Sequence, residues 1–340
     1  MVTVANVAQR AGVSPATAAR VLSGNGYASA GARRAVLEAA KEIGYVPNHI
    51  ARSLRTRRTQ LAGLLIGDVE NSFYSVIAKN VESVAKDAGY RVVLCNSNED
   101  PGAEEQYLRL LEGMQVDGLI ITPTGRNQRQ LRRLLQKGTV IVQIDRIVEG
   151  LNADAVLLDN EAGAMEAVSH LVAAGHSRIG LLTGPRDVLT ARQRQEGYER
   201  ALREHGIPVR PELIRDGSFL HDHAIEAATK LLGSGAAPTA IFAANNILAE
   251  GCFLALANLG LTVPKNVSLV AFDDVPWMSM VRPQLTTVRQ PVADMARSAA
   301  ELLLRRLRGN TPLSSTSVFR SELVVRGSVA PLRNTRRKSS

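Results

Sequence analysis

The first 45 positions of the chain carry apolar residues at the three- and four-residue spacing of short amphipathic helices. A first helix follows a cap at Thr3, ends at Gly12, and has an apolar face of Val4, Val7, Ala8 and Ala11. A second follows a cap at Ser14 and carries Thr17, Ala18, Val21 and Leu22. Two such helices joined by a glycine-containing turn predict a helix-turn-helix, whose second helix enters the major groove of DNA. A helical subdomain without a DNA role is the alternative.

A third helix and a short apolar segment follow. The helix is predicted from a cap at Ser29 to Gly44, with apolar positions at Val36, Leu37, Ala40 and Ile43. The segment, residues 48–55, is too short to be stable as an isolated helix, and it places Ala51 and Leu54 on one face between arginines. An apolar wedge among cations suits insertion into a minor groove. An interdomain helix that buries Leu54 is the alternative.

From Leu61 onward the pattern changes to short aliphatic runs that alternate with amphipathic stretches. The runs predict strands at Leu61–Ile66, Arg91–Leu94, Gly118–Ile121, Val140–Ile144, Ala155–Leu158, Ile179–Leu182, Ala240–Phe242 and Leu269–Ala271, with a further strand near 212–216. The stretches predict helices at 73–88, 160–174, 190–205, 221–232 and 246–259. This alternation predicts an α/β fold of two doubly wound parallel lobes behind a helical headpiece. Such lobes bind ligands at the carboxyl ends of their strands.

The formal net charge of +9 is unevenly distributed along the chain. Residues 1–60 hold nine Lys and Arg against two acids, and the last fifteen residues hold five more with none. The concentration of positive charge on the predicted helix-turn-helix is what phosphate contacts require. We therefore expect three parts: a DNA-binding domain (1–58), a two-lobed ligand-binding domain (59–330), and a disordered basic tail (331–340).

Several classes of protein are disfavoured by the sequence. No run approaches 18 apolar residues, and the start lacks the pattern of a secretory signal, so we expect a cytoplasmic protein without membrane contact. The two cysteines, Cys95 and Cys252, stand in apolar contexts and predict buried thiols rather than a disulfide or zinc site. Without a glycine-rich nucleotide motif or a nucleophile–base set, we expect no enzyme, no cofactor and no metal site.

Polar and aromatic residues gather just past the predicted strand ends, where a ligand would bind. Besides Asp68, the set consists of Asn71, Phe73, Tyr74, Asp145, Arg146, Arg194, Phe219, Asn245, Asp273 and Gln290. A sugar needs carboxylate acceptors, amide and guanidinium donors and an aromatic face, and this set supplies all three. Each residue alone is typical of loop capping, but so many at consecutive strand ends predict a sugar pocket. Trp277 lies near this region, as a ligand stack or as a packing residue.

The chain resembles the lac-repressor (LacI–GalR) family of transcriptional regulators from Thr3 to about Val329. The resemblance rests on Val7-Ala8, Gly12-Val13-Ser14, Thr17 and Arg20-Val21-Leu22, on Gly44-Tyr45-Val46-Pro47-Asn48, and on Ala51-Arg52-Ser53-Leu54. It implies a homodimer on a pseudo-palindromic operator, with residues 48–55 as a hinge helix that folds on DNA and Leu54 inserted at the central base step. It also implies a repressor that a small sugar releases.

By the same resemblance, the residues at positions 15, 16 and 20 read bases, and Thr3, Ser14 and Thr17 contact phosphates. Pro15 and Ala16 lack hydrogen-bonding side chains, so Arg20, which can pair with a guanine, becomes the main reader in the major groove. The pocket set is similar to that of ribose-binding members, which makes a ribose-like pentose the first candidate effector. Asn246 departs from the aspartate usual after the pocket asparagine. The alternatives are a regulator that depends on a corepressor or partner, and a sugar-binding protein without a DNA function.

Overall fold

The computed structural model describes residues 2–23, 26–45, 58–233, 235, 237–309 and 314–332 of the 340. The chain divides into two compact units, Met1–Thr59 and Gln60–Ser340, which we describe separately. The predicted hinge, with Asn48, Ala51 and Leu54, lies outside the described residues.

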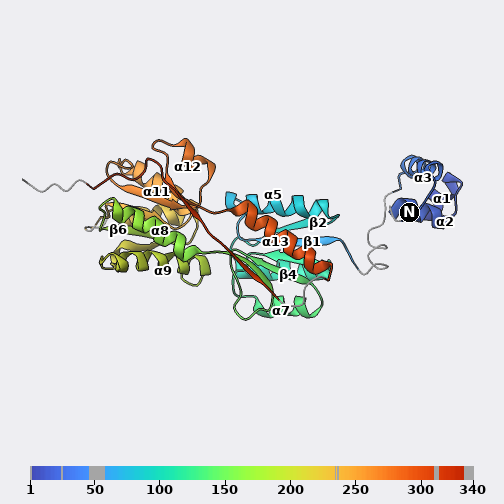
Figure 1. Ribbon diagram of the computed structural model, residues 1–340, viewed down its shortest axis with the longest axis horizontal. Helices are drawn as coiled ribbons and strands as arrows, with labels where there is room; N and C mark the ends of the chain where they lie inside the picture. Colours follow the sequence, from blue (N-terminus) through green and yellow to red (C-terminus); the bar gives the residue numbers. More distant parts are fainter. Residues whose placement is uncertain are drawn as a thin grey trace, which may run out of the picture. The chain divides into compact units, whose positions relative to one another are not determined.

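The described residues of the first unit form the helices α1 (Val4–Ala11), α2 (Pro15–Ser23) and α3 (Ala30–Glu42), which are labelled in Figure 1. Thr3 caps α1 through its hydroxyl, and Gly12 ends that helix in the left-handed conformation at φ 66°. The three helices share one core, made of Val7, Ala8, Ala18, Val21, Val36, Ala39 and Ala40. Leu37, which we predicted on the apolar face of α3, is instead 52% exposed. It lies one residue, or about 100°, away from the stripe of Val36 and Ala40 around the helix.

The described residues of the second unit form two six-stranded sheets. The first sheet has the order β11-β5-β4-β3-β1-β2, and its strands are β1 (Leu61–Ile66), β2 (Arg91–Asn96), β3 (Gly118–Ile121), β4 (Val140–Ile144), β5 (Asp154–Leu158) and β11 (Thr316–Phe319). The second has the order β12-β10-β9-β8-β6-β7, with β6 (Ile179–Thr183), β7 (Ile214–Asp216), β8 (Ala240–Ala243), β9 (Ser268–Phe272), β10 (Thr286–Arg289) and β12 (Glu322–Val324). All neighbours are parallel except β10 and β12. The predicted α/β class with two doubly wound lobes is confirmed.

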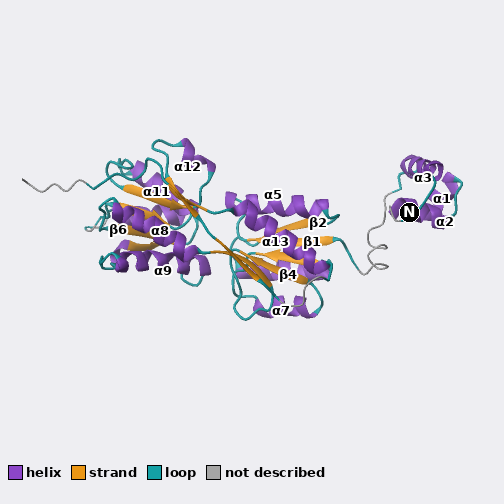
Figure 2. Ribbon diagram, in the orientation of Figure 1, coloured by secondary structure: helices purple, strands orange, loops and turns teal. Residues whose placement is uncertain are grey.

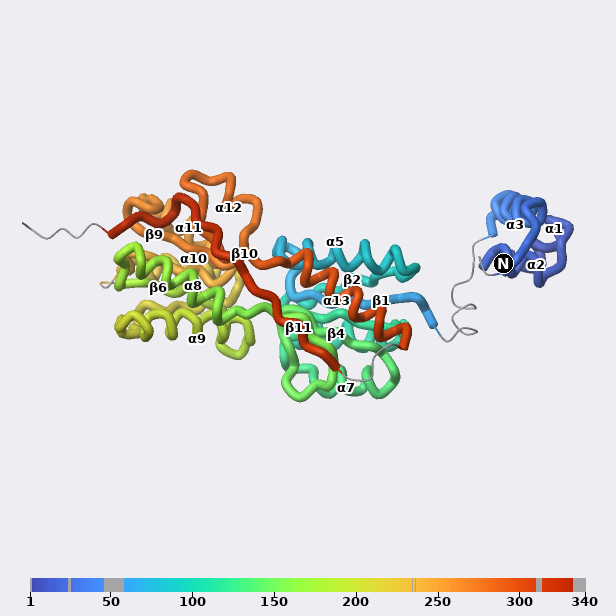
Figure 3. Tube along the Cα trace, in the orientation of Figure 1, coloured from blue at the N-terminus to red at the C-terminus, as the bar shows by residue number. Residues whose placement is uncertain are grey.

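Helices cover these sheets (Figure 2). The amino lobe carries α5 (Ser72–Asp87), α6 (Pro101–Gly113), α7 (Gln128–Gln136) and α13 (Val292–Leu307). The carboxyl lobe carries α8 (Asn160–Ala173), α9 (Leu189–Glu204), α10 (His221–Leu232), α11 (Asn246–Asn258) and the short α12 (Pro276–Met280), with a 3-10 turn at Pro211–Leu213. The chain passes between the lobes after β5, after β10, and between β11 and β12 (Figure 3).

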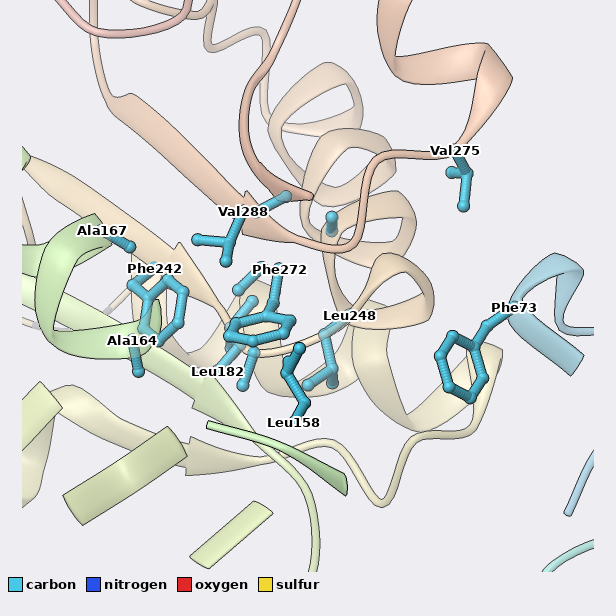
Figure 4. Packing of buried hydrophobic residues seen from close by; sticks show 14 of the residues in the cluster. Phe73, Leu158, Ala164, Ala167, Leu182, Phe242, Leu248, Phe272, Val275 and Val288 are labelled. Atoms are coloured by element: carbon cyan, nitrogen blue, oxygen red, sulfur yellow. The ribbon is translucent and has the colours of Figure 1, made fainter. Parts of the chain in front are cut away.

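The two lobes share one topology, because β2-β1-β3-β4-β5 in the first corresponds to β7-β6-β8-β9-β10 in the second. The order reverses between β1 and β3 and between β6 and β8. Such switch points leave a crevice at the carboxyl ends of the strands, where ligands bind. In the core beneath, Phe272 lies among Leu182, Leu248 and Val288 (Figure 4). Leu332, which we placed in the basic tail, donates its N–H to the Ala174 carbonyl at the end of α8 (2.9 Å); residues 333–340 lie outside the described range.

Candidate functional site

All ten predicted pocket residues line one cavity of about 460 Å³ in the second unit. They come from the segments that follow seven strands, β1, β4, β6, β7, β8, β9 and β10, which are distributed along the sequence. The cavity wall also contains Asp68 and residues that the sequence analysis did not select: Val69, Glu70, Asn96, Asn98, Glu99, Thr190 and Leu220. The structure therefore brings the whole predicted set to one place and adds a group from the loop after β2.

Two asparagines are oriented by the helices that they cap. The Asn71 Oδ1 accepts the N–H of Phe73 (3.0 Å), and the Asn245 Oδ1 accepts the N–H of Leu248 (2.8 Å). Each side-chain carbonyl oxygen therefore already accepts a hydrogen bond from a backbone N–H in the first turn of a helix. The amide NH₂ groups of Asn71 and Asn245 are therefore the parts that remain as donors at the cavity they line.

Two aspartates occupy equivalent places, Asp145 after β4 and Asp273 after β9, and both have positive φ angles (70° and 71°). Asp273 accepts the backbone N–H of Asn246 (3.1 Å) and the side-chain amide of Gln290 (2.5 Å). Asp145 forms an ion pair with the Arg146 Nε (3.3 Å). Burial raises the pKa of Asp145 above its ordinary value, against the opposing charges of Arg146 and Arg194. The left-handed backbone turns both carboxylates toward the same cavity.

Arg194 is held rigidly at the floor of the cavity. Its Nε donates to the Asn160 Oδ1 (2.9 Å), its Nη1 donates to the Ala244 carbonyl (2.7 Å), and its guanidinium lies 3.7 Å from the ring centroid of Phe272. The residue is only 4% exposed, and this burial lowers its pKa. A guanidinium fixed in this way keeps donors available to a ligand without further loss of rotamer freedom.

Arg146, by contrast, is engaged by a carboxylate that the sequence analysis overlooked. Its Nη1 and Nη2 donate to the two oxygens of Glu99 (2.5 and 2.9 Å), and Nη2 also donates to the Tyr74 hydroxyl (3.1 Å). Burial alone would raise the pKa of Glu99, but the charge and hydrogen bonds of Arg146 outweigh it and lower that pKa. Glu99 follows a predicted strand, as the selected residues do, and that position was the signal available to find it.

Asn246 joins the two lobes. Its Nδ2 donates to the Asn71 Oδ1 (3.1 Å), across from α11 in the carboxyl lobe to the start of α5 in the amino lobe. Its own Oδ1 is buried and accepts no hydrogen bond from the described residues. Asn246, which stands where the family usually has an aspartate, therefore provides an uncharged hydrogen-bond donor between the two lobes.

Aromatic rings come from both sides of the cavity. Phe73 extends from α5 toward the carboxyl-lobe core (Figure 4), and Phe219 follows β7 with a positive φ of 56°. The Phe219 ring lies against Gly184, where an added Cβ would overlap it. Trp277 packs on Phe253 with ring centroids 6.0 Å apart and is not among the residues that line the cavity.

In the first unit, Thr3 caps α1, and the other described residues predicted to contact DNA lie at the start of α2 (Ser14, Pro15, Ala16 and Thr17) and one turn further along it (Arg20). Thr3, Ser14, Pro15, Ala16 and Arg20 are exposed, and Thr17 is half-buried. The Ser14 hydroxyl caps α2 by accepting the Thr17 N–H (3.2 Å) and lies 2.9 Å from the Thr17 hydroxyl.

Comparisons with known proteins match both units. Residues 3–48 match the family described as bacterial regulatory proteins, lacI family, and residues 168–329 match a periplasmic binding protein-like domain. The chain is 35% identical over 316 residues to catabolite control protein A of Priestia megaterium, which spans 92% of this chain and 95% of that protein. It is 36% identical over 307 residues to the ribose operon repressor of Halalkalibacterium halodurans, which spans 90% and 91%. The solved structure of the lac repressor dimer bound to operator and the anti-inducer ONPF has a TM-score of 0.85 at 27% identity, over 97% of this chain and 99% of that one.

A helix-turn-helix unit followed by two α/β lobes around a polar cavity defines a class of DNA-binding transcriptional regulators. The chain belongs to the lacI family of bacterial regulatory proteins. Within the described residues, no helix has the length and apolar content that crossing a membrane requires.

Proposed function

We propose that the protein is a dimeric repressor that releases a pseudo-palindromic operator when a small neutral sugar closes its two lobes, with a ribose-like pentose as the first candidate. Residues 1–58 serve as the DNA-binding domain and residues 59–330 as the effector-binding and dimerisation domain. The observation that carries the proposal is the convergence of ten preselected donors, acceptors and rings on one cavity. The similarity to a ribose operon repressor supports the choice of sugar.

The charges of the cavity support a neutral ligand over an anionic one. Five acidic side chains line it (Asp68, Glu70, Glu99, Asp145 and Asp273) against Arg146 and Arg194. Arg146 is already paired with Glu99, so one guanidinium remains to attract a phosphate or carboxylate. Hydroxyl groups, by contrast, can donate to Asp145 and Asp273 and accept from the amides of Asn71 and Asn245.

On the DNA side, we propose that α2 lies in the major groove, with Arg20 donating to a guanine. Pro15 and Ala16 contribute apolar contact, and the hydroxyls of Ser14 and Thr17, with Thr3, approach phosphates. The exposure of Ser14, Pro15, Ala16 and Arg20 at the start of α2 and along it supports this assignment. The hinge role of Asn48, Ala51 and Leu54 rests on the sequence resemblance alone.

A thermal-shift panel of pentoses, hexoses and their phosphates tests the ligand. The true effector stabilises the protein increasingly with the logarithm of its concentration, by about 2.7 kcal/mol at one hundred times its Kd. Arg194→Met should abolish the shift. The matched control is Arg200→Met on the same helix, a surface arginine paired with Glu161 and Glu204. Stabilisation by sugar phosphates alone would refute the neutral-sugar proposal.

Operator fragments selected from a randomised duplex library test the response. Adding the effector should lower the affinity for the selected fragment without changing the mass of the dimer by analytical ultracentrifugation. A higher operator affinity in the presence of the effector would instead show that the small molecule acts as a corepressor. A monomer that binds one half-site would refute the dimeric arrangement.

A further inference from the structure

The side chain of Arg20 lies against the backbone that follows α2. Its Nη1 donates to the carbonyl of Tyr27 (3.2 Å). An ideal Cβ at Gly26 would stand 2.9 Å from the Cδ of Arg20 and 3.0 Å from its Cγ. The backbone at Gly26 has a φ of 97°, a conformation that residues with a side chain rarely adopt. Gly26 and Tyr27 thus contact both the stem and the head of an exposed arginine.

These contacts restrict a side chain that is otherwise free to rotate. The stem of Arg20 occupies the space that a side chain at residue 26 would need, and the Tyr27 carbonyl fixes the direction of the guanidinium. One bond from Nη1 leaves Nη2 and the second Nη1 hydrogen as donors, which is enough for a bidentate contact with a guanine. An arginine held in the reading orientation gives up less conformational freedom on binding.

We propose that Gly26, together with the carbonyl of Tyr27, is a positioning residue that holds Arg20 in the orientation in which it reads a base pair. The inference rests on the proposed role of Arg20 as the main reader of the major groove. Because neither Pro15 nor Ala16 can form hydrogen bonds with its side chain, little else in α2 compensates when Arg20 is displaced. The residue at position 26 therefore controls how sharply the protein selects that base pair.

The test compares binding-site selection from a randomised duplex library for the full chain and four variants. Arg20→Ala identifies the base pair that Arg20 reads, because the preference there should fall by about tenfold or more. Gly26→Ala should lower the preference at that same position by about three- to tenfold and leave other positions unchanged. The double variant should be no less selective than Arg20→Ala, within about twofold, because the two residues act through one contact.

Gly44→Ala is the control for backbone strain. Gly44 also has a positive φ (63°), but no atom lies within 4 Å of a Cβ added there. This variant should keep the preference at the Arg20 position. Thermal melting establishes that each variant folds, and affinity for a non-selected duplex should stay within about twofold of the parent, because it depends on phosphate contacts.

The outcomes separate the two claims. If Arg20→Ala keeps every preference, the reading role of Arg20 fails, and the positioning role of Gly26 fails with it. If Arg20→Ala loses a preference that Gly26→Ala keeps, only the positioning role is refuted. It is also refuted if Gly44→Ala weakens the same position equally, or if the double variant is clearly less selective than Arg20→Ala.

Discussion

Replacing Asn246 by aspartate tests how the two lobes are held together around the cavity. The Asn246 amide donates to the Asn71 Oδ1, an oxygen that also accepts the Phe73 N–H and therefore cannot turn away. An aspartate at position 246 would place a carboxylate oxygen, which is a hydrogen-bond acceptor, opposite the Asn71 Oδ1, which is also an acceptor. It would also bring a second carboxylate toward Asp273, which contacts the backbone N–H of residue 246.

The magnitude follows from these contacts. Loss of one interlobe hydrogen bond costs about 1 kcal/mol, and the facing acceptors bring the total to about 2 kcal/mol in the closed arrangement. Because the bond forms only when the lobes are together, this cost appears in ligand binding, as an affinity lower by about thirtyfold. Folding should be little affected, since an aspartate in the first turn of α11 interacts favourably with the helix amino terminus.

Titration calorimetry with the effector found by the thermal-shift panel measures the change. Asn246→Ala is the matched variant, because it removes the bond without adding an acceptor, and it should lose about fivefold in affinity. The unfolding temperatures of the unliganded proteins verify that both variants fold. An aspartate variant that binds as tightly as the parent, or more tightly than Asn246→Ala, would refute the reasoning.

Three other predictions concern the same unit. Gly184→Ala should push the Phe219 ring aside and weaken effector binding by about tenfold in titrations, and unchanged affinity would show that the ring does not cover the ligand. Asp154→Asn should lower the free energy of unfolding in urea by about 3 kcal/mol, because Asp154 is 3% exposed and accepts two bonds from Arg306 (2.6 and 2.7 Å). Arg306 keeps the pKa of Asp154 below its ordinary value, although burial alone would raise that pKa. The parent protein should therefore lose the stability that this ion pair contributes only as the pH falls through the lowered pKa. The Asp154→Asn variant should not show this acid-induced loss of stability. Burial raises the pKa of Asp145 above 3.8, so effector affinity should fall as the pH drops toward that raised pKa, and Asp145→Asn should flatten the profile.

The fold was largely predictable because its elements are marked locally. The aliphatic runs from Leu61 to Ala271 correspond to strands in the structure, and Thr3, Ser14 and Ser29 cap helices as predicted. The strands β11 and β12 were not predicted, because they are short and half-exposed, each begins with polar residues, and neither contains an aliphatic run. Their place in the two sheets depends on partners distant in sequence, β5 and β10.

The cavity was predicted as a set of residues, but not as a set of contacts. Strand ends mark the residues that meet, because parallel strands point their carboxyl ends the same way. Which of them pair with one another is not encoded locally. Arg146 lines the cavity, its contact with a ligand stays a prediction, and the structure adds that its guanidinium pairs with Glu99, from a different strand end.

By itself, the sequence determined the helical and strand elements, their caps, the two-part organisation and the family, since all of these depend on spacings within a few residues. Only the tertiary structure decided which donors remain open in the cavity, that Asn246 joins the lobes, and that Gly26 lies against Arg20. These relations depend on how closely side chains approach after the chain has packed, and packing is set by elements that are distant along the sequence.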